Sequence, residues 1–432
     1  MLERFFGLEA HGTTVKREVV AGFTTFLTMA YIIVVNPNIL QAAGMDYGAV
    51  FVATCLAAAI GTLIMGLFAN YPIALAPGMG LNAFFAFTVV GSMGYSWQTA
   101  LGAVFFSGLI FLLLSMFKVR EWIINSIPLA LRYGITAGIG FFLALIALKN
   151  GQVVVDHPAT LVGIGNILSP QALLFGAGFV IICALYYRRI TGSVMIGILL
   201  VTVAALAMGL VEFEGVASAP PSLAPTFLEL DIAGAFQLSM LGVIFAFLFV
   251  DLFDTAGTLV GAAERGGLLD KNGKLPRLGK ALMADSSATM AGAALGTSST
   301  TSYIESTAGI SAGGRTGLTA VVVAILFLAC LFLSPIASMI PSYATAPALL
   351  FVAVLMTSGL RDIDWNDVTE AAPAVVTALA MPLTFSIANG IALGFISYAL
   401  IKLIAGRASQ ISPSVAVIAA LFILKFIFIG AD

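Results

Sequence analysis

The chain has 432 residues, of which 60% are hydrophobic and 9% are charged, and its net charge is −2. Because a soluble domain carries about a quarter charged residues, this composition excludes a soluble globular protein and predicts an integral membrane protein. The small net charge gives no indication of nucleic-acid binding.

Apolar runs long enough to cross a bilayer recur along the whole chain, and without the alternation of a membrane barrel they predict helical spans. The predicted spans, in chain order, are residues 19–40, 48–68, 72–91, 97–117, 122–148, 171–187, 193–211, 237–262, 281–295, 299–312, 317–334, 345–359, 371–386 and 388–405. We therefore expect an all-α polytopic membrane protein with fourteen transmembrane helices. The first span lacks a small-residue cleavage site and so reads as a retained helix rather than a signal peptide. The sequence leaves open whether a further apolar run, 412–430, crosses the membrane.

The basic residues predict the orientation of these spans. Most of the 19 Lys and Arg residues fall in the connections that lie inside when the N-terminus is inside. Cytoplasmic connections of membrane proteins are enriched in Lys and Arg. We therefore expect a multi-pass protein of the cytoplasmic (inner) membrane with a cytoplasmic N-terminus.

The second half of the chain repeats features of the first. Spans five and twelve both open with Ile-Pro, and spans seven and fourteen share a glycine-containing apolar pattern. These shared features predict two repeats of seven spans each. Because seven is odd, the second repeat crosses the membrane in the opposite orientation to the first, as in many secondary transporters. We expect a first repeat at residues 1–236, a second at 237–406 and a C-terminal apolar segment at 407–432.

Two stretches at matching places in the halves are the least helical of the spans. Residues 71–90 contain two prolines and two glycines before an apolar run, and residues 296–314 open with Thr and Ser. Such residues favour extended structure or helix caps. Each stretch is therefore predicted to form an extended segment followed by a half-helix, and such broken spans mark the substrate sites of transporters.

Four carboxylates fall within the spans: Asp251, Asp254, Asp285 and Glu305. Ionisable residues inside a membrane are expensive and usually functional. For Asp285, the sequence is equally compatible with capping a helix and with a functional role. Asp251 and Asp254 share one helix face, and small residues after Asp254 leave room for a ligand. Glu305 opens the second half-helix, where a capping role is the alternative to a functional one.

The negative charge of these carboxylates indicates which class of substrate the site would accept. An anion would be repelled, whereas a neutral planar molecule with adjacent N–H groups suits a carboxylate, and a nucleobase has this chemistry. Phe84, Phe85 and Phe253 are candidates for stacking, although the same residues suit an ordinary core. Carboxylates that gain and lose a proton also permit proton coupling. The sequence predicts no cofactor, no metal site and no disulfide for its three cysteines and two histidines.

Four motifs resemble the AzgA-like purine permeases, which belong with the nucleobase transporters of the uracil-permease fold. These motifs are GFTTFLTMAYIIVVNPNIL (22–40), ALAPGMGLNAFFAF (74–87), FVDLFDTAGTLVG (249–261) and TSSTTSYIESTAGISAGGRTG (297–317). The resemblance implies a core domain of spans one to four and eight to eleven, and a gate domain of spans five to seven and twelve to fourteen. It also implies proton-coupled uptake of adenine, guanine or hypoxanthine by a homodimer in the lipid membrane.

The resemblance assigns site residues motif by motif. Asp254 takes the place of the base-binding acid of span eight, Glu305 that of the acid of span ten, and Gly80 and Asn82 match span three. Ile304 replaces a glycine, and Thr255 and Thr258 replace the histidines of uracil permeases, so a histidine proton relay is not carried over. The candidates for substrate binding are Asp254, Glu305, Gly80, Asn82, Ile304, Phe253, Phe84 and Thr255, and those for proton coupling are Glu305, Asp254 and Asp251.

Three alternatives remain open from the residues. The chain could be a same-fold transporter of another nucleobase, such as uracil or xanthine. An anion transporter of this fold would be expected to carry a basic residue in span ten, which is absent. A membrane aspartyl-type enzyme could use paired acids, but its Gly-x-Gly-Asp signature is also absent. We therefore expect a transporter and not an enzyme.

Overall fold

The computed structural model describes residues 2–116, 127–268, 270 and 275–428. The predicted start of the fifth span (122–126) and part of the 263–280 loop lie outside these residues. In the first half the elements are α1 (Leu2–Phe6), α2 (Val15–Met29), α3 (Ile32–Gln41), α4 (Tyr47–Ile64), η1 (Met65–Ala69), β1 (Leu75–Pro77), α5 (Met79–Ala83), η2 (Phe84–Ser92), α6 (Trp97–Met116), α8 (Leu129–Asn150), β2 (Val154–His157), β3 (Leu161–Ile164), α9 (Pro170–Tyr187), α10 (Ser193–Ala207) and α11 (Ile232–Ala235).

In the second half the elements are η3 (Leu238–Met240), α12 (Leu241–Gly266), α13 (Leu278–Leu295), β4 (Thr300–Ser302), α14 (Ser306–Ser311), α15 (Gly317–Ala329), η4 (Cys330–Leu333), α16 (Ser334–Ser338), α17 (Ser342–Thr357), η5 (Ser358–Asp362), α18 (Val368–Leu383), α19 (Ile387–Ile404), η6 (Ala408–Gln410) and α20 (Pro413–Phe428).

Among the described residues, nine helices are long and apolar enough to cross a membrane, and four shorter apolar helices accompany them. This makes the protein a predominantly helical, multi-pass membrane protein. The predicted total of fourteen spans is not reached by this criterion, because α10 and α18 are shorter than a full span, the third and tenth spans are interrupted, and α13, the predicted ninth span, is not among the qualifying helices.

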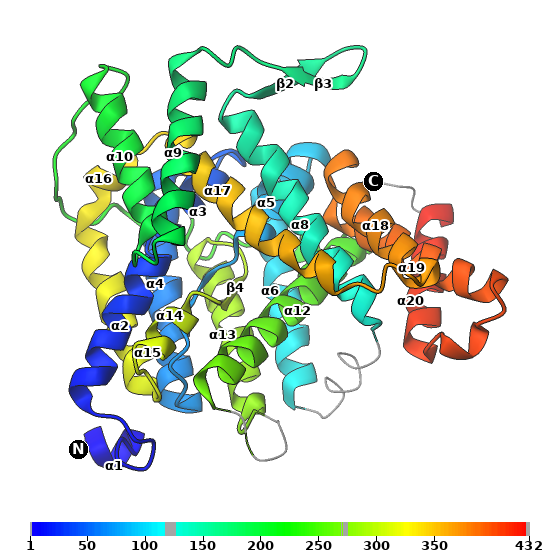
Figure 1. Cartoon of the computed structure of the whole chain (residues 1–432), viewed down its shortest axis with the longest axis horizontal. Helices are drawn as coiled ribbons and strands as arrows, with labels where there is room; N and C mark the ends of the chain where they lie inside the picture. The colour runs from blue at the N-terminus through cyan, green and yellow to red at the C-terminus, as the bar shows by residue number, and fades with distance from the viewer. Residues whose placement is uncertain (1, 117–126, 269, 271–274, 429–432) are drawn as a thin grey trace.

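The helices of Figure 1 pack in two groups. In one group α2, α4, α6, α13 and α15 contact one another extensively, with α3 and α14 beside them. In the other, α8 packs against α17 and α18, α18 packs against α19, and α9 and α10 pair with each other and with α17. The candidate site described below lies where these two groups face each other.

The first predicted span is broken into two helices. Helix α2 ends at Met29, α3 begins at Ile32, and Ala30 and Tyr31 form a turn between them. The apolar pattern of residues 19–40 continues through this turn, so hydropathy alone does not predict it. The turn matters because Tyr31 reaches the tenth span, as shown below.

The two interrupted spans pair with each other through their extended segments. Strand β1 runs antiparallel to β4, with Leu75 opposite Ser302 and Pro77 opposite Thr300. Each strand is followed by a helix: α5 continues directly into the π-helical turns of η2, whereas α14 covers only Ser306–Ser311. The predicted extended segments are therefore present, and the helical part of the tenth span is shorter than expected.

A buried carboxylate on α2 holds the start of α15. Glu18 is fully buried and accepts hydrogen bonds from the backbone N–H groups of Arg315 (2.9 Å), Thr316 (3.3 Å) and Thr319 (3.2 Å). The Thr319 hydroxyl donates a further bond of 2.6 Å to the same carboxylate. The first N–H groups of a helix have no partner within the helix, so Glu18 satisfies them from outside.

Gly317 lies at the close crossing of α15 and η1. A Cβ atom on Gly317 would overlap the carbonyl oxygen of Gly66, and one on Gly66 would lie 2.7 Å from the carbonyl oxygen of Gly317. We expect Gly317→Ala to lower the free energy of unfolding by about 3 kcal/mol, because two backbones must move apart. Thermal unfolding in detergent measures this, with Gly176→Ala as the control, since a Cβ there meets nothing within 4 Å. Equal stability of the two variants would contradict the prediction.

Candidate functional site

A cavity of about 1090 Å³ lies between the two helix groups. One wall consists of the residues around the β1–β4 pair together with part of α12, and the other consists of α8, α17 and the α9–α10 turn. The cavity therefore collects residues from both halves of the chain around the two interrupted spans.

Two of the predicted carboxylates, Asp254 and Glu305, line this cavity. Asp254 is exposed to it and Glu305 is partly buried. The Tyr31 hydroxyl donates a hydrogen bond of 2.6 Å to Glu305 Oε1. The Glu305 side chain makes no capping hydrogen bond to α14, so the capping alternative is not the arrangement that the structure adopts. One oxygen of Glu305 is held by Tyr31, and the carboxylate can offer the other to a ligand.

Backbone hydrogen bonds between the two interrupted spans fix the position of Glu305. The backbone N–H of Gly78 donates to the Ser299 carbonyl at 2.9 Å, and that of Tyr303 donates to the Ala74 carbonyl at 2.9 Å. The Tyr303 hydroxyl donates to the Pro77 carbonyl at 2.6 Å. Because these bonds lie just before Glu305, the carboxylate is held by a rigid element rather than by a flexible loop.

The other two acids lie behind the cavity wall. Asp251 and Asp285 are buried, and neither lines the cavity. Asp251 accepts a hydrogen bond of 3.0 Å from the Thr289 hydroxyl, and Asp285 accepts one of 2.9 Å from the Ser302 hydroxyl. Asp251 thus connects α12 to α13, and Asp285 connects α13 to β4, so both acids support the element that carries the site.

The remaining predicted residues divide between the cavity and the core. Gly80, Phe253 and Ile304 line the cavity. Asn82 and Thr255 are buried outside it, and neither Asn82 amide atom has a hydrogen-bond partner among the described residues. Direct contact of these two side chains with a ligand is therefore absent from this arrangement.

Phe84, a predicted stacking residue, does not line the cavity in this structure. Its ring is fully buried and packs edge-to-face on Phe247 of α12, with ring centroids 5.0 Å apart. Edge-to-face packing is a favourable aromatic geometry in a core, and it turns the ring away from the cavity. Phe85 is also fully buried, so of the three candidate rings only Phe253 lines the cavity.

Sequence reasoning missed two groups at this site. Tyr31 lies far from Glu305 in the sequence, and a tyrosine within an apolar run gives no specific signal. Arg189 of the α9–α10 turn also lines the cavity, although the site candidates predicted from the sequence are all acidic or neutral. No cluster of His, Cys, Asp and Glu that could hold a metal ion occurs among the described residues.

If the chain is the transporter that its sequence predicts, replacing Tyr31 with Phe is expected to lower the uptake efficiency (kcat/KM) about 10-fold. The variant removes a hydrogen bond to a charged group, which contributes about 1.5–3 kcal/mol, and leaves the ring packing intact. Initial uptake rates in proteoliposomes measure the effect. Tyr95→Phe is the matched control, because the Tyr95 hydroxyl does not line the cavity. Equal uptake by Tyr31→Phe and Tyr95→Phe would show that the Tyr31–Glu305 bond has no role in transport.

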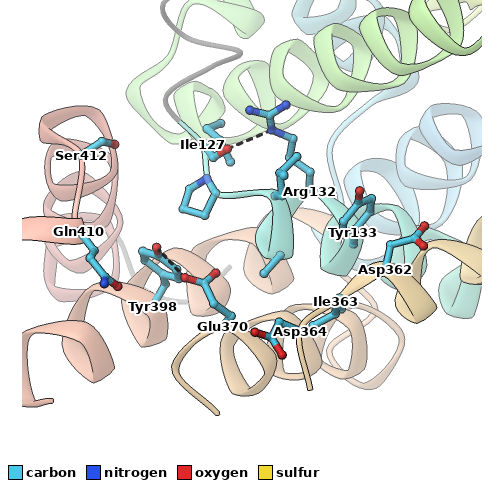
Figure 2. A pocket seen from close by; sticks show the side chains of 13 residues that line it. Ile127, Arg132, Tyr133, Asp362, Ile363, Asp364, Glu370, Tyr398, Gln410 and Ser412 are labelled. Atoms are coloured by element: carbon cyan, nitrogen blue, oxygen red, sulfur yellow. Dashed lines mark hydrogen bonds between the residues drawn. The ribbon is translucent and has the colours of Figure 1, made fainter. Parts of the chain in front are cut away.

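A second cavity of about 820 Å³ lies beside α8, α18 and α19 (Figure 2). Next to it, buried Lys402 forms an ion pair of 2.7 Å with Glu370 and donates a 2.7 Å hydrogen bond to Gln410. The Tyr398 hydroxyl also donates to Glu370, at 3.3 Å. These contacts tie α18 to α19 and to the turn before α20, which is a structural role.

Replacing Glu370 with Gln is expected to destabilise the fold, because Lys402 stays buried without its charged partner. Breaking a buried ion pair costs about 3–5 kcal/mol, and the bond to Gln410 places this case at the lower end. The midpoint of thermal unfolding in detergent would fall. Asp364→Asn is the control, since Asp364 lines the same cavity but is exposed. An unchanged midpoint for Glu370→Gln would exclude a structural role for the pair.

A family model described as "Permease family", with the short name Xan_ur_permease, matches residues 16–393. The chain belongs to this permease family. It is 54% identical to the adenine permease AdeP of Escherichia coli, over 100% of this chain and 97% of that protein. It is 48% identical to the guanine/hypoxanthine permease PbuG of Bacillus subtilis, over 99% of this chain and 100% of that protein.

These relatives are permeases, so the chain is a membrane transporter and the aspartyl-type enzyme is set aside. Solved structures of low identity share its fold. The transmembrane domain of the cyanobacterial bicarbonate transporter BicA superposes with a TM-score of 0.66 at 16% identity, covering 86% of this chain and 96% of that one. Murine Solute Carrier 26 family member A9, an anion transporter in the inward-facing state, gives 0.65 at 10% identity, covering 91% and 69%.

Proposed function

We propose that this permease imports purine nucleobases and binds them in the 1090 Å³ cavity between Asp254 and Glu305. The observation that carries the proposal is the pair of carboxylates on one cavity, one of them held by Tyr31. A carboxylate accepts two adjacent N–H donors, which purines present along their edges. Relatives that are named adenine and guanine/hypoxanthine permeases support a purine over uracil.

Phe253, Gly80 and Ile304 complete the proposed binding surface. Phe253 offers a ring face for stacking. Gly80 allows α5 to pack closely against α8 at the cavity wall, since a Cβ atom there would lie 2.5 Å from the Ile139 side chain. Asn82, Thr255 and Asp251 are proposed to support the site from behind rather than to touch the base.

Transport is proposed to be proton symport by alternating access. Asp254 and Glu305 are carboxylates that can take up and release a proton as the site changes its exposure. The packing of the helices in two groups supports movement of a gate domain against a core domain, and it fits the proposed inverted repeat of 1–236 and 237–406. A cytoplasmic N-terminus and a homodimer belong to the same proposal.

The test is uptake of labelled adenine, guanine, hypoxanthine, uracil and sulfate into proteoliposomes, with and without an inward proton gradient. We expect uptake of at least one purine, accelerated by the gradient. Uptake of uracil or sulfate alone would replace the purine proposal with another nucleobase or with an anion. Purine uptake at the same rate with and without the gradient would support a purine substrate and contradict proton symport.

A further inference from the structure

The proposed purine cavity carries opposite charges at its two ends. Asp254 and Glu305 lie beside the β1–β4 pair, whereas Arg189 lies in the α9–α10 turn. This turn is at the protein surface, where the neighbouring Tyr187 is 88% exposed. The cavity wall is therefore acidic beside the β1–β4 pair and basic at the surface turn between α9 and α10.

Arg189 is free to bind a ligand. Its side chain is exposed, lines the cavity, and makes no hydrogen bond or ion pair with another residue that the structure describes. Its backbone has a left-handed φ of 58°, an uncommon conformation for a residue other than glycine. The hydroxyl groups of Tyr187, Thr191 and Ser193 belong to the same part of the cavity wall.

The volume of the cavity exceeds the needs of a single base. Pockets for drug-sized ligands measure about 300–1,000 Å³, and a purine base is smaller than such ligands, yet the cavity measures about 1090 Å³. A base held at the acidic end thus leaves space between itself and Arg189.

We propose that this cavity also binds purine nucleoside 5′-monophosphates, with the base between Asp254 and Glu305 and the phosphate on Arg189. The proposal rests on the purine site proposed above. A guanidinium binds a phosphate through two parallel hydrogen bonds, and the nearby hydroxyl groups can donate further ones. The sugar occupies the space between the two ends.

Such a nucleotide acts as an inhibitor and not as a substrate. Alternating access would have to enclose the phosphate within the membrane, where a charged group is expensive. The bound nucleotide therefore holds the cavity open toward the side that carries Arg189. Because a nucleotide is the product of adding a sugar phosphate to an imported base, its binding slows import when that product accumulates.

The experiment is competition binding on the purified full-length protein in detergent, which exposes both faces of the protein. A labelled purine base is displaced by its own nucleoside or by the corresponding 5′-monophosphate, in wild type, Arg189→Gln, Arg189→Lys and Arg188→Gln. Arg188 is the matched control, because it is an exposed neighbour that does not line the cavity.

In wild type and Arg188→Gln, we expect the monophosphate to displace the base at a concentration about 10-fold or more below that of the nucleoside. This ratio falls to about one in Arg189→Gln and to an intermediate value in Arg189→Lys, which keeps the charge but loses the planar fork. High salt lowers the ratio in wild type. The ratio is formed within each variant, so a variant that binds the base less well still gives a valid result.

A wild-type ratio of one, or an unchanged ratio in Arg189→Gln, overturns the nucleotide proposal and leaves Arg189 as a cation at the membrane surface. An equal loss in Arg188→Gln also overturns it, since that result indicates general charge attraction. If no purine base binds to the wild-type protein at all, the proposed function fails instead. The two failures are therefore distinct.

Discussion

Replacing Glu305 with Gln is expected to reduce purine uptake about 100-fold or more. The amide keeps one acceptor oxygen but loses the negative charge, and hydrogen bonds to charged groups contribute about 1.5–3 kcal/mol each. Glu305 also accepts the Tyr31 hydroxyl at 2.6 Å, so the substitution weakens this contact together with those to the base. Initial rates of labelled purine uptake in proteoliposomes measure the effect.

Glu264→Gln is the matched control for this substitution. Glu264 is an exposed acid near the end of α12 and does not line the cavity. Exchange of labelled for unlabelled purine at equilibrium separates binding from coupling, because exchange needs no net proton movement. If Glu305→Gln keeps exchange but loses gradient-driven uptake, Glu305 serves the coupling. If Glu305→Gln takes up purine as fast as Glu264→Gln, Glu305 has no role in substrate binding or coupling.

Replacing Glu18 with Ala is expected to lower the free energy of unfolding by roughly 3–6 kcal/mol. The substitution leaves the N–H groups of Arg315 and Thr316 without their acceptor, whereas the Thr319 N–H keeps the Thr316 carbonyl at 3.2 Å. An unsatisfied buried donor costs about 1–3 kcal/mol, and the negative charge at the start of α15 is also lost. The midpoint of thermal unfolding and the yield of monodisperse protein in detergent should both fall.

Glu18→Gln provides a graded comparison, because it retains an acceptor oxygen and should destabilise the fold less. Glu9→Ala is the control, since Glu9 is an exposed acid near the same helix. If Glu18→Ala and Glu9→Ala unfold at the same temperature, the bonds between Glu18 and the start of α15 contribute nothing measurable to stability.

The composition and the local residue types were sufficient to predict the membrane class and the two interrupted spans. Two prolines and two glycines in residues 71–90, and a run of hydroxyl residues from 297, exclude a regular helix on local grounds alone. The pairing of β1 with β4 was beyond such reasoning, because it joins residues more than two hundred positions apart. Local patterns do not encode which distant segment completes a strand.

The candidate site was predicted in the same uneven way. Asp254 and Glu305 could be identified from the sequence because a carboxylate in an apolar span is energetically costly and usually functional. Both line the cavity. The packing of Phe84 on Phe247 was not predicted, because a position in a helix does not reveal which face meets another helix. Tyr31 and Arg189 were missed because their relevance depends on tertiary position alone.

The β1–β4 pair also limits which molecules the transporter can accept. A short sheet normally has outer edges to which an extended peptide can add as a further strand. Here Thr62 Oγ1 accepts a 2.9 Å bond from the Leu75 N–H and donates one of 3.0 Å to its carbonyl, and Thr289 occupies the Thr300 carbonyl at 3.0 Å. With the Leu75 N–H and carbonyl and the Thr300 carbonyl already bonded, these edge positions are closed to an added peptide strand.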